Sequence, residues 1–541
     1  SQTFSNNSTD VDVLVPYDAT QNITLNNNLS RYGHSVSMSL NGEHFAVGAP
    51  GSQEITQIDQ TNSNVSVTTT TTTTTIPAHW DLDTYSTYNS SDTPRVWMGY
   101  SMSMSGDGKR AIITSPYTSQ WNTGGGQNGR AEIVKWSDSA QLWYRIGYIS
   151  GIAAGAQLGV SAAISRNGLK MIVGGRNESD AQGNAYRGSA VIYNLDATTA
   201  ATTGSPSYVY GEASGDGFGD TVAIDADGSR IAVAAPFHDT GGTNSGRVRI
   251  YEWNGSSYVT MGSPIDGGMA GNTGDNFGSR HGRGVAMSDD GSRVVIGSPV
   301  HAGARVYQWS GSQWQQMGQH LNSPQPNCMF GNNVSMNAAG TRVAIGAPNY
   351  DNISVGSYDG GAIFVYDWNG SSWTQLGQML HSSTVGNHNM GASALSSDGS
   401  RIVCGHNPQN PHGYGQTVRV FDYNTSTSTW DQVTTSTGPW GNNWGMDVAI
   451  SSDGSRFAVS GNRQGYSNQG KMYTYTFKAA QTYTNTTTSG VYAGTNVNYT
   501  STWQNTLGSG GMYFYRHYNY LPSGGNYAGS MTNNTTYDPN G

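Results

Sequence analysis

Aspartate followed by glycine is the pattern in this sequence that recurs often enough to suggest chemistry. It stands inside closely similar stretches such as SGDGKRAIITSP (105–116), DADGSRIAVAAP (225–236) and SDDGSRVVIGSP (288–299). A carboxylate can work as a general acid or base, but Asp-Gly is also favoured in tight turns because both residues tolerate positive φ. The repetition therefore poses a choice between a repeated binding loop and a repeated structural unit.

Linear catalytic motifs do not resolve this choice. The sequence contains no HExxH, no CxxC pair, no GxxxxGK[ST] and no GxSxG, so neither a zinc protease, a phosphate-binding loop nor a nucleophile elbow is indicated. The twelve histidines are scattered, and the carboxylates recur mainly in turns. We therefore predict a protein that is not an enzyme, with no catalytic residue and no metal ligand. A hydrolase or lyase that gathers its polar groups at one mouth of the fold is the third functional alternative.

Composition indicates an all-β protein. The chain has 541 residues, 73 of them glycine, and only 11% are charged, which is typical of turn-rich β structure. A net charge of −9 without a run of Lys or Arg argues against nucleic-acid binding. No apolar run approaches the roughly 20 residues that span a bilayer, so membrane insertion is not expected. The start at Ser1 suits a processed, secreted protein, and we expect an extracellular location.

A repeat of about 60 residues organises most of the chain. Each copy begins with an aromatic or apolar residue followed by one of these glycines: Gly33, Gly99, Gly159, Gly219, Gly278, Gly331, Gly391 and Gly445. Within a copy, two short apolar runs flank the Asp-Gly or Asn-Gly turn, and an alternating run such as GRVRIYEW (246–253) and a second turn such as WNGSSY (253–258) follow. Four antiparallel strands per copy result, so the Asp-Gly stretch is first of all a hairpin.

Eight four-stranded copies predict a β-propeller of about eight blades, with seven as the alternative count. We expect the propeller over residues 21–480, after an N-terminal segment 1–20. Residues 21–30 occupy the place of an outer strand with no partners before it, so we expect them to close the last blade and hide two sheet edges. Residues 481–486 could supply that strand instead. The first copy carries a Thr-rich insertion at 61–76, which is either an O-glycosylated segment or an edge strand.

The pattern Phe-Gly near Gly219, Asp-Gly-Ser-Arg at 227–230 and Gly-Ala-Pro at 48–50 resembles the FG-GAP propellers of integrin α-subunit heads and of many secreted microbial and algal proteins. The resemblance covers about residues 20–480 and implies a propeller, but the family includes adhesion, scaffolding and glycan-binding roles. It also suggests calcium loops. Here the nearest match, Asp225-x-Asp227-Gly228, lacks a second acidic group downstream, so we expect no cofactor, with calcium as a minor alternative.

Tryptophans bracket the second turn of several copies: Trp253, Trp309, Trp314, Trp368 and Trp373. The favoured interpretation is that they form cross-strand aromatic pairs that stabilise each hairpin. Exposed rings that stack on sugars or on another subunit are the alternative. Of the two cysteines, Cys404 falls at an apolar strand position, so buried free thiols are expected rather than a Cys328–Cys404 bridge.

Asn-x-Ser/Thr sequons are abundant and suggest a glycoprotein. The candidate glycosylation sites are Asn22, Asn28, Asn64, Asn89, Asn177, Asn254, Asn352, Asn369, Asn424, Asn485 and Asn498. After residue 480 the repeat gives way to a Thr/Tyr/Asn/Gly-rich extension, 481–541, whose charged residues are Arg516 and Asp538. This extension could be a linker, a β appendage or a strand that docks on another subunit. Its candidate assembly residues are Tyr513, Tyr515, Tyr518 and Tyr520.

Two functional hypotheses from different classes follow. The first is a secreted structural glycoprotein that self-assembles, into filaments if the contacts do not close, through the propeller edge and the C-terminal extension. Its partner would be another copy of itself. The alternative is an adhesion module that binds glycans or a cell-surface partner through loops at one mouth of the propeller.

Overall fold

A computed structural model divides the chain into two compact units, Trp80–Phe477 and a second unit formed by Ser1–His79 together with Lys478–Gly541. The side chains and turns it describes are those of these ranges: 97–118, 127–153, 155–179, 186–268, 277–278, 284–300, 303–352, 359–381, 389–406, 417–437, 444–461 and 471–478. Outside them it assigns strands, and it places Trp80 in one of these.

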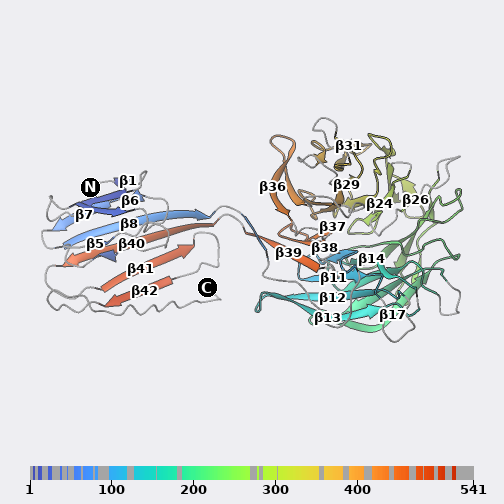
Figure 1. The fold of residues 1–541 in the computed structure, drawn as a ribbon, viewed down its shortest axis with the longest axis horizontal. Coiled ribbons are helices and arrows are strands. Elements are labelled where there is room, and N and C mark those ends of the chain that lie inside the picture. The colour runs from blue at the N-terminus through green and yellow to red at the C-terminus, as the bar shows by residue number, and fades with distance from the viewer. Residues whose placement is uncertain are drawn as a thin grey trace. The chain divides into compact units, whose positions relative to one another are not determined.

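Trp80–Phe477 is a seven-bladed β-propeller of four-stranded antiparallel sheets (Figure 1). The inner strands are β10 (Met102–Met104), β14 (Leu158–Ile164), β18 (Thr221–Ile224), β23 (Val285–Met287), β28 (Asn333–Met336), β33 (Met390–Leu395) and β37 (Trp444–Ile450). The second strands are β11 (Arg110–Ser115), β15 (Lys170–Gly175), β19 (Arg230–Ala235), β24 (Arg293–Ser298), β29 (Arg342–Ala347), β34 (Arg401–His406) and β38 (Arg456–Gly461).

The outer half of each blade completes the sheet. The third strands are β12 (Arg130–Ser137), β16 (Ser189–Leu195), β20 (Arg247–Trp253), β25 (Gly303–Trp309), β30 (Ala362–Trp368), β35 (Thr417–Asn424) and β39 (Lys471–Lys478). The outer strands are β13 (Leu142–Ser150), β17 (Thr202–Tyr210), β21 (Tyr258–Thr260), β26 (Trp314–Gln316), β31 (Trp373–Gln375), β36 (Thr429–Thr437) and β9 (His79–Leu82). Blades three to five add β22 (Ile265–Asp266), β27 (Leu321–Asn322) and β32 (Leu380–His381).

The antiparallel order gives the propeller two distinct faces. Turns between first and second strands and between third and outer strands lie on one face, which we call the hairpin face. Connections between second and third strands, and from each outer strand to the next blade, lie on the opposite face, which we call the loop face. The second strands are buried between neighbouring blades: β11 is buried along its whole length, and β19, β24 and β29 at every residue but the first.

The last blade is closed by a strand from the N-terminal side, since its order is β37-β38-β39-β9. The ring of Trp80 in β9 lies 4.7 Å from that of Phe457 and 5.1 Å from that of Phe477, between ring centroids. The expectation of an N-terminal closing strand therefore holds, but its position at 21–30 is wrong. That segment contains β3 (Asn22–Asn26), which pairs with β2 (Asp10–Leu14) instead.

Two further expectations are corrected in the same region. The blades number seven rather than eight, and the propeller begins at Trp80 rather than at residue 21. The first repeat copy forms the small pair β4 (Ser37–Met38) and β5 (Phe45–Ala46), which belongs to the second unit. The physical reason is that a blade needs four strands, and the runs after β5 pair in a different sheet.

The second unit combines both ends of the chain. Its largest sheet has the order β42-β41-β40-β8-β7, with β7 (Gln57–Asn62), β8 (Val65–Ile76), β40 (Gln481–Tyr492), β41 (Asn498–Asn505) and β42 (Phe514–Asn519). Figure 1 shows β8 and β40 side by side. The pair β1 (Phe4–Ser5) and β6 (Glu54–Ile55) also belongs to this unit. The Thr-rich segment is thus an interior strand of a sheet, neither an insertion in a blade nor an edge strand.

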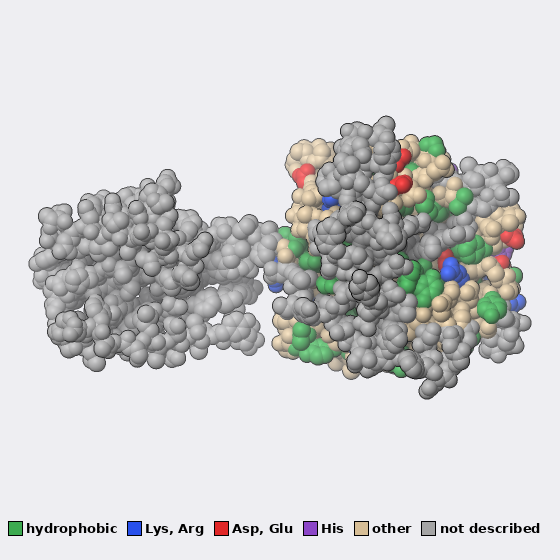
Figure 2. Space-filling model, in the orientation of Figure 1, with side chains coloured by type: hydrophobic (Ala, Val, Ile, Leu, Met, Phe, Trp, Pro, Cys, Tyr) green, Lys and Arg blue, Asp and Glu red, His purple; other side chains and the backbone are tan. Residues whose placement is uncertain are grey.

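The described surface of the propeller carries few charges. On the face drawn in Figure 2, charged side chains are few among the hydrophobic and uncharged polar groups of the described surface. In the described part of the chain, no helix is both long and apolar enough to cross a membrane.

Candidate functional site

The Asp-Gly stretches make the same set of bonds in nearly every blade. In the sixth, Ser396 Oγ donates to Asp398 Oδ1 (2.6 Å), the Ser400 N–H donates to the same oxygen (2.9 Å), and the Arg401 N–H donates to Ser396 Oγ (3.0 Å). Gly399 takes φ +72°, which a residue with a Cβ adopts only with strain. The hydroxyl of Ser396 and the carboxylate of Asp398 therefore bond within the turn and hold its shape.

The basic residue that ends this stretch joins each blade to the next. Its side chain donates to a backbone carbonyl in the following hairpin turn, and the seven bonds form a closed ring. They are Arg110 to Gly168, Lys170 to Gly228, Arg230 to Asp290, Arg293 to Ala339, Arg342 to Gly399, Arg401 to Gly454 and Arg456 to Gly108. The last of them links blade seven to blade one. The repeated residue is therefore a joint between blades and not a free cation.

A second ring of bonds narrows the hairpin end of the central channel. Backbone N–H groups of the turns donate to the turn of a neighbouring blade, as from Ala338 to Ser397, from Ser397 to Ser452 and from Ser452 to Gly106 (2.8–2.9 Å). Arg166 lies across this opening. It forms an ion pair with Asp289 of blade four and donates to Ser397 Oγ of blade six (2.6 Å). The channel thus ends in a polar plug at the hairpin face.

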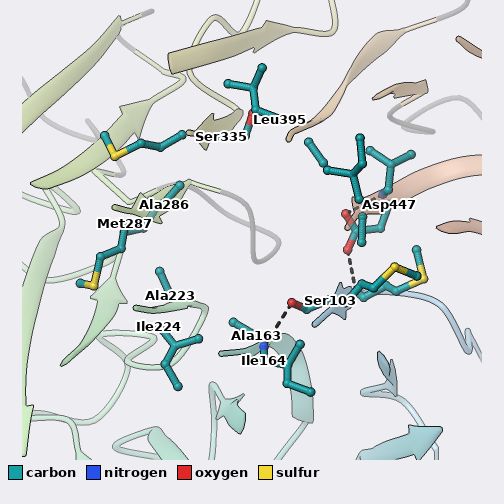
Figure 3. A pocket seen from close by; sticks show the side chains of 18 of the residues that line it. Ser103, Ala163, Ile164, Ala223, Ile224, Ala286, Met287, Ser335, Leu395 and Asp447 are labelled. Carbon is teal, nitrogen blue, oxygen red and sulfur yellow. Dashed lines mark hydrogen bonds between the residues drawn. The ribbon is translucent and has the colours of Figure 1, made fainter. Parts of the chain in front are cut away.

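Inner strands of all seven blades line the channel, whose volume is about 240 Å³ (Figure 3). One position repeated in every inner strand is Ser or Ala: Ser103, Ala163, Ala223, Ala286, Ser335, Ala394 and Ala449. Side chains also satisfy inner-strand N–H groups, since Met102 donates to Asp447 Oδ2 (2.7 Å) and Ile164 donates to Ser103 Oγ (3.1 Å). This volume lies close to the ~300 Å³ at which small-molecule pockets begin.

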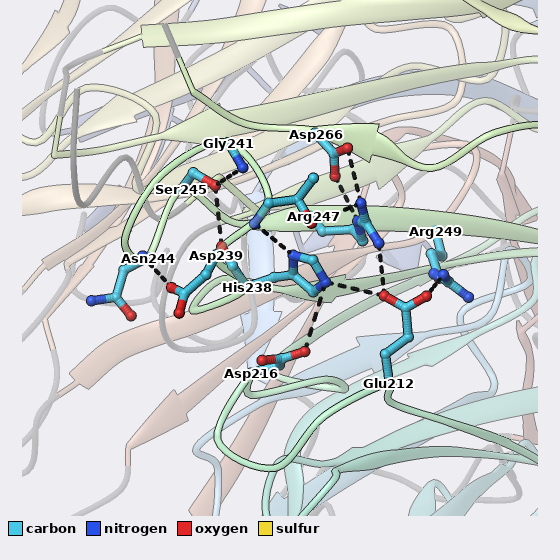
Figure 4. A network of polar contacts seen from close by, with 11 residues as sticks. Glu212, Asp216, His238, Asp239, Gly241, Asn244, Ser245, Arg247, Arg249 and Asp266 are labelled. Atoms are coloured by element: carbon cyan, nitrogen blue, oxygen red, sulfur yellow. Dashed lines mark hydrogen bonds and ion pairs between the residues drawn. The ribbon is translucent and has the colours of Figure 1, made fainter. Parts of the chain in front are cut away.

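A polar network occupies the loop face beside blade three (Figure 4). Glu212 receives Arg247 (2.7 Å), Arg249 and His238 Nε2 (3.0 Å), and Arg247 also pairs with Asp266 at 2.6 Å. These residues come from the connection into blade three, from its second-to-third-strand loop and from β20 and β22. No pattern in the sequence indicates this network, because its members lie in separate segments.

Beside Glu212, the network contains His238 and Asp216. His238 Nδ1 accepts the Thr240 N–H (3.2 Å), so the ring proton is on Nε2 and points to Glu212. Burial raises the pKa of Asp216, whose Oδ2 lies 3.8 Å from His238 Nε2. The nearby Asp239 accepts the Asn244 N–H (2.8 Å) through Oδ1. The arrangement holds three segments of the loop face together.

The described side chains of Tyr117 and Arg176, on the loop face, likewise contact other residues of the propeller. The Tyr117 ring makes edge contacts with Trp97 at 5.5 Å and with Tyr100 at 5.7 Å. Arg176 pairs with the fully buried Asp220 (3.0 Å) and donates to Gln157 Oε1 (3.1 Å). A buried pair of this kind fixes neighbouring blades.

Blade three departs from the common turn at one residue. Where other turns have Ser or Asn, it has Asp225, which is 3% exposed and accepts bonds from Ser229 Oγ (2.7 Å) and the Arg230 N–H (2.9 Å) through Oδ2. Burial raises the pKa of Asp225 to about 6. Within the described residues, no group of three or more His, Cys, Asp or Glu side chains is arranged to hold a metal ion.

The tryptophans form the expected cross-strand pairs. Trp309 and Trp314 lie 5.4 Å apart between ring centroids, and Trp368 and Trp373 the same distance apart. They also join blades, since Trp373 Nε1 donates to the Met317 carbonyl of the preceding blade (2.8 Å). Trp253 pairs in the same way with Tyr258, at 5.1 Å. The structural interpretation of these rings is confirmed.

The repeat glycines have a structural role wherever they are described. Gly99, Gly159, Gly219, Gly278, Gly331 and Gly445 all take positive φ, while Gly391 does not. Gly331 also donates its N–H to the Gly346 carbonyl (3.0 Å). Gly33 lies outside the described residues. The two cysteines are free and buried, which confirms the expectation of unpaired thiols.

The sequons lie in different environments. Asn254 and Asn369 are exposed in turns on the hairpin face, and Asn177 and Asn424 are partly exposed. Asn352 is 4% exposed, so a glycan does not fit there in the folded protein and this candidate is withdrawn. The remaining candidates lie outside the described side chains: Asn22, Asn28, Asn64, Asn89, Asn485 and Asn498. So do Tyr513, Tyr515, Tyr518 and Tyr520, of which Tyr515 and Tyr518 belong to strand β42.

Comparisons with known proteins show the fold alone. No family model and no curated protein matches the chain. Among solved structures, the β-propeller domain of Cps50 (Swd1) from Myceliophteria thermophila is 8% identical, with a TM-score of 0.45, and the match covers 73% of this chain and 99% of that one. Hydrazine synthase of Kuenenia stuttgartiensis is 13% identical, with a TM-score of 0.43, and the match covers 72% and 97%.

A third similar structure corrects an expectation. The periplasmic gluconolactonase of Pseudomonas aeruginosa is 10% identical, with a TM-score of 0.42, over 63% of this chain and 85% of that one. Propellers similar to this one bear the names of enzymes. The prediction that excluded an enzyme is therefore wrong. The physical reason is that a propeller can gather polar groups from several blades at one mouth, where no linear motif would reveal them.

Proposed function

We propose that this protein is an extracellular structural glycoprotein that self-assembles through its second unit and the rim of the propeller. The observation that carries the proposal is the sheet β42-β41-β40-β8-β7, which is built from both ends of the chain and has β42 and β7 as its edge strands. Edge strands with few charges are templates for pairing with another chain. The ionisable residues of β42 are Arg516, His517 and the tyrosines, and β7 carries the single carboxylate Asp59.

The propeller suits the part of a rigid body in such an assembly. Its hairpin face is tied by bonds between all seven blades. Exposed sequons at Asn254 and Asn369 lie on that hairpin face, so glycans at these two positions would lie on the side of the propeller opposite the loop face.

Edge-strand substitutions test the proposal in the full chain. Purified protein is examined by sedimentation velocity and negative-stain imaging beside the double variant Tyr515→Lys/Tyr518→Lys, because charges on an edge strand oppose pairing. We expect assemblies from the native chain and single particles from the variant. Tyr186→Lys, at a propeller tyrosine that is 53% exposed, is the matched control and should assemble normally. A native chain that stays a single particle at every concentration would overturn the proposal.

A binding role at the loop face is the second candidate, and one observation favours it. The hairpin face repeats the same bonds in each blade, whereas the loop face carries groups that differ between blades, such as the Glu212 network of blade three and the Arg176–Asp220 pair that joins blades two and three. Variation on a fixed scaffold is typical of recognition surfaces. A glycan array probed with the double variant, which would bind as a single particle, separates this role from assembly.

A further inference from the structure

The longest strand pair in the second unit joins opposite ends of the chain. β8 and β40 pair antiparallel over twelve residues, from Ile76 opposite Gln481 to Val65 opposite Tyr492. β8 also pairs with β7 on its other side. The C-terminal strands β41 and β42 follow β40 in the same sheet, so β8 is where residues from the C-terminal end attach to the N-terminal part of the unit.

The sequence of this ladder does not distinguish one register or one copy of the chain from another. β8 contains the uninterrupted run Thr68–Thr75, and β40 contains Thr482, Thr484 and Thr486–Thr488. A shift of the pairing by two residues sets threonine against threonine again. Register is weakly specified in strands of this kind, which are prone to alternate pairing and strand exchange.

The propeller does not depend on the C-terminal segment. Its last blade is completed by β9, which comes from the N-terminal side, and the fourth strand position is therefore filled before residue 481 is reached. Residues 481–541 can leave their own β8 without opening any blade. β8 would then expose one edge, and the released segment would carry strands that need a partner.

We propose that copies of this protein join by exchange of the C-terminal segment, so that β40 of one copy pairs with β8 of the next. This inference rests on the proposed self-assembly and names its partner, a second copy of the same chain, and its joint. Each copy gives one segment and receives one, so the contact is heterologous and extends into a linear assembly unless two copies exchange reciprocally.

Cysteine pairs across the ladder test the exchange. Thr71 lies opposite Thr486, and Thr74 lies opposite Tyr483. Because opposite residues of an antiparallel ladder alternate between hydrogen-bonded and non-hydrogen-bonded pairs, one of these two pairs belongs to each class. The class with the closer Cβ atoms suits a disulfide. One preparation carries Thr71→Cys alone and the other Thr486→Cys alone. The two are mixed while reduced, allowed to assemble, oxidised, and analysed on a denaturing gel without reductant. Thr74→Cys and Tyr483→Cys form the second set.

Neither variant of a set can form the ladder disulfide within one chain, and the natural Cys328 and Cys404 are fully buried. Exchange predicts a linked pair of chains in the mixture of at least one set, and none in either preparation alone. Tyr186→Cys mixed with Thr486→Cys is the matched control, since Tyr186 is an exposed residue of the propeller and lies outside the ladder, and this mixture should link at least tenfold less.

The outcomes separate this inference from the function on which it rests. Assemblies seen in sedimentation without a linked pair in either set would overturn the exchange and leave self-assembly standing. Absence of assemblies from the native chain would overturn both. Single chains that carry both Thr71→Cys and Thr486→Cys should run as linked multimers when assembled, whereas monomers closed on themselves in an assembled sample would contradict the exchange.

Discussion

The two faces of the propeller differ in how much of their chemistry is repeated. On the hairpin face each blade makes the same turn and the same bond to its neighbour, as Arg342 does to Gly399 and Arg401 to Gly454. On the loop face the groups differ from blade to blade, and Glu212 of blade three has its own set of three cationic or donor partners. Repeated residues therefore specify the architecture, and the features that could distinguish this protein from other propellers lie on the loop face and in the second unit.

The largest expected effect comes from a repeat glycine, Gly331, which precedes β28 at the loop face. Gly331 has φ +95°, and a Cβ there would lie 2.2 Å from the Gly303 carbonyl oxygen. Backbone strain and overpacking together should lower the free energy of unfolding of Gly331→Ala by about 4 kcal/mol. Gly147→Ala is the control, because nothing lies within 4 Å of its added Cβ. Equal stabilities by urea unfolding would contradict an architectural role for the repeat glycines.

The bond ring of the hairpin face should give the next largest effect. Arg342 pairs with both carboxylate oxygens of Asp367 (2.6 and 2.7 Å) and bonds to the next blade through Gly399 (2.7 Å). Arg342→Ala removes all three bonds and should lower the free energy of unfolding by about 2–3 kcal/mol. In Lys109→Ala the lost partner is Asp138, in a pair exposed to solvent, and the loss should stay below about 1 kcal/mol. Thermal unfolding of both variants measures the two losses of unfolding free energy. Equal losses would contradict a stabilising role of the bond ring.

Short-range chemistry explains what the sequence could predict. The Asp-Gly turns, the repeat glycines and the paired tryptophans each depend on residues a few positions apart, so a single copy such as 390–437 contains the information for its own four strands. The pairing of Trp309 with Trp314, for example, follows from a turn of four residues between them.

Long-range pairing explains what the sequence could not predict. The first copy carries the Tyr32-Gly33 and Asn41-Gly42 signals of a blade, and nothing local reveals that the following strands pair elsewhere. β9 and the Thr-rich β8 find partners in β39 and β40 from the far end of the chain. The network of Glu212, His238 and Arg247 was missed for the same reason, since three segments bring its members together.

The smallest effect separates blade three from the other six and depends on pH. The folded state binds the proton of Asp225 more tightly than the unfolded chain does, because burial raises the pKa of its carboxyl to about 6 from an unfolded value of about 3.9. Its stabilising contribution is therefore complete below about pH 4 and is lost as the pH rises through 6. Asp225→Ser should be more stable than the native chain at pH 8 by about 2 kcal/mol, with no gain at pH 4.

The converse variant shows whether the turn alone produces this pH dependence. Ser396 of blade six donates to Asp398 as a serine at position 225 would donate to Asp227. Ser396→Asp should therefore create in blade six the buried carboxyl that blade three has, and should add a loss of stability between pH 5 and 8 of similar size. Thermal unfolding across that range compares the native chain with both variants. Three parallel profiles would mean that Asp225 stays ionised and that its turn behaves like the other six.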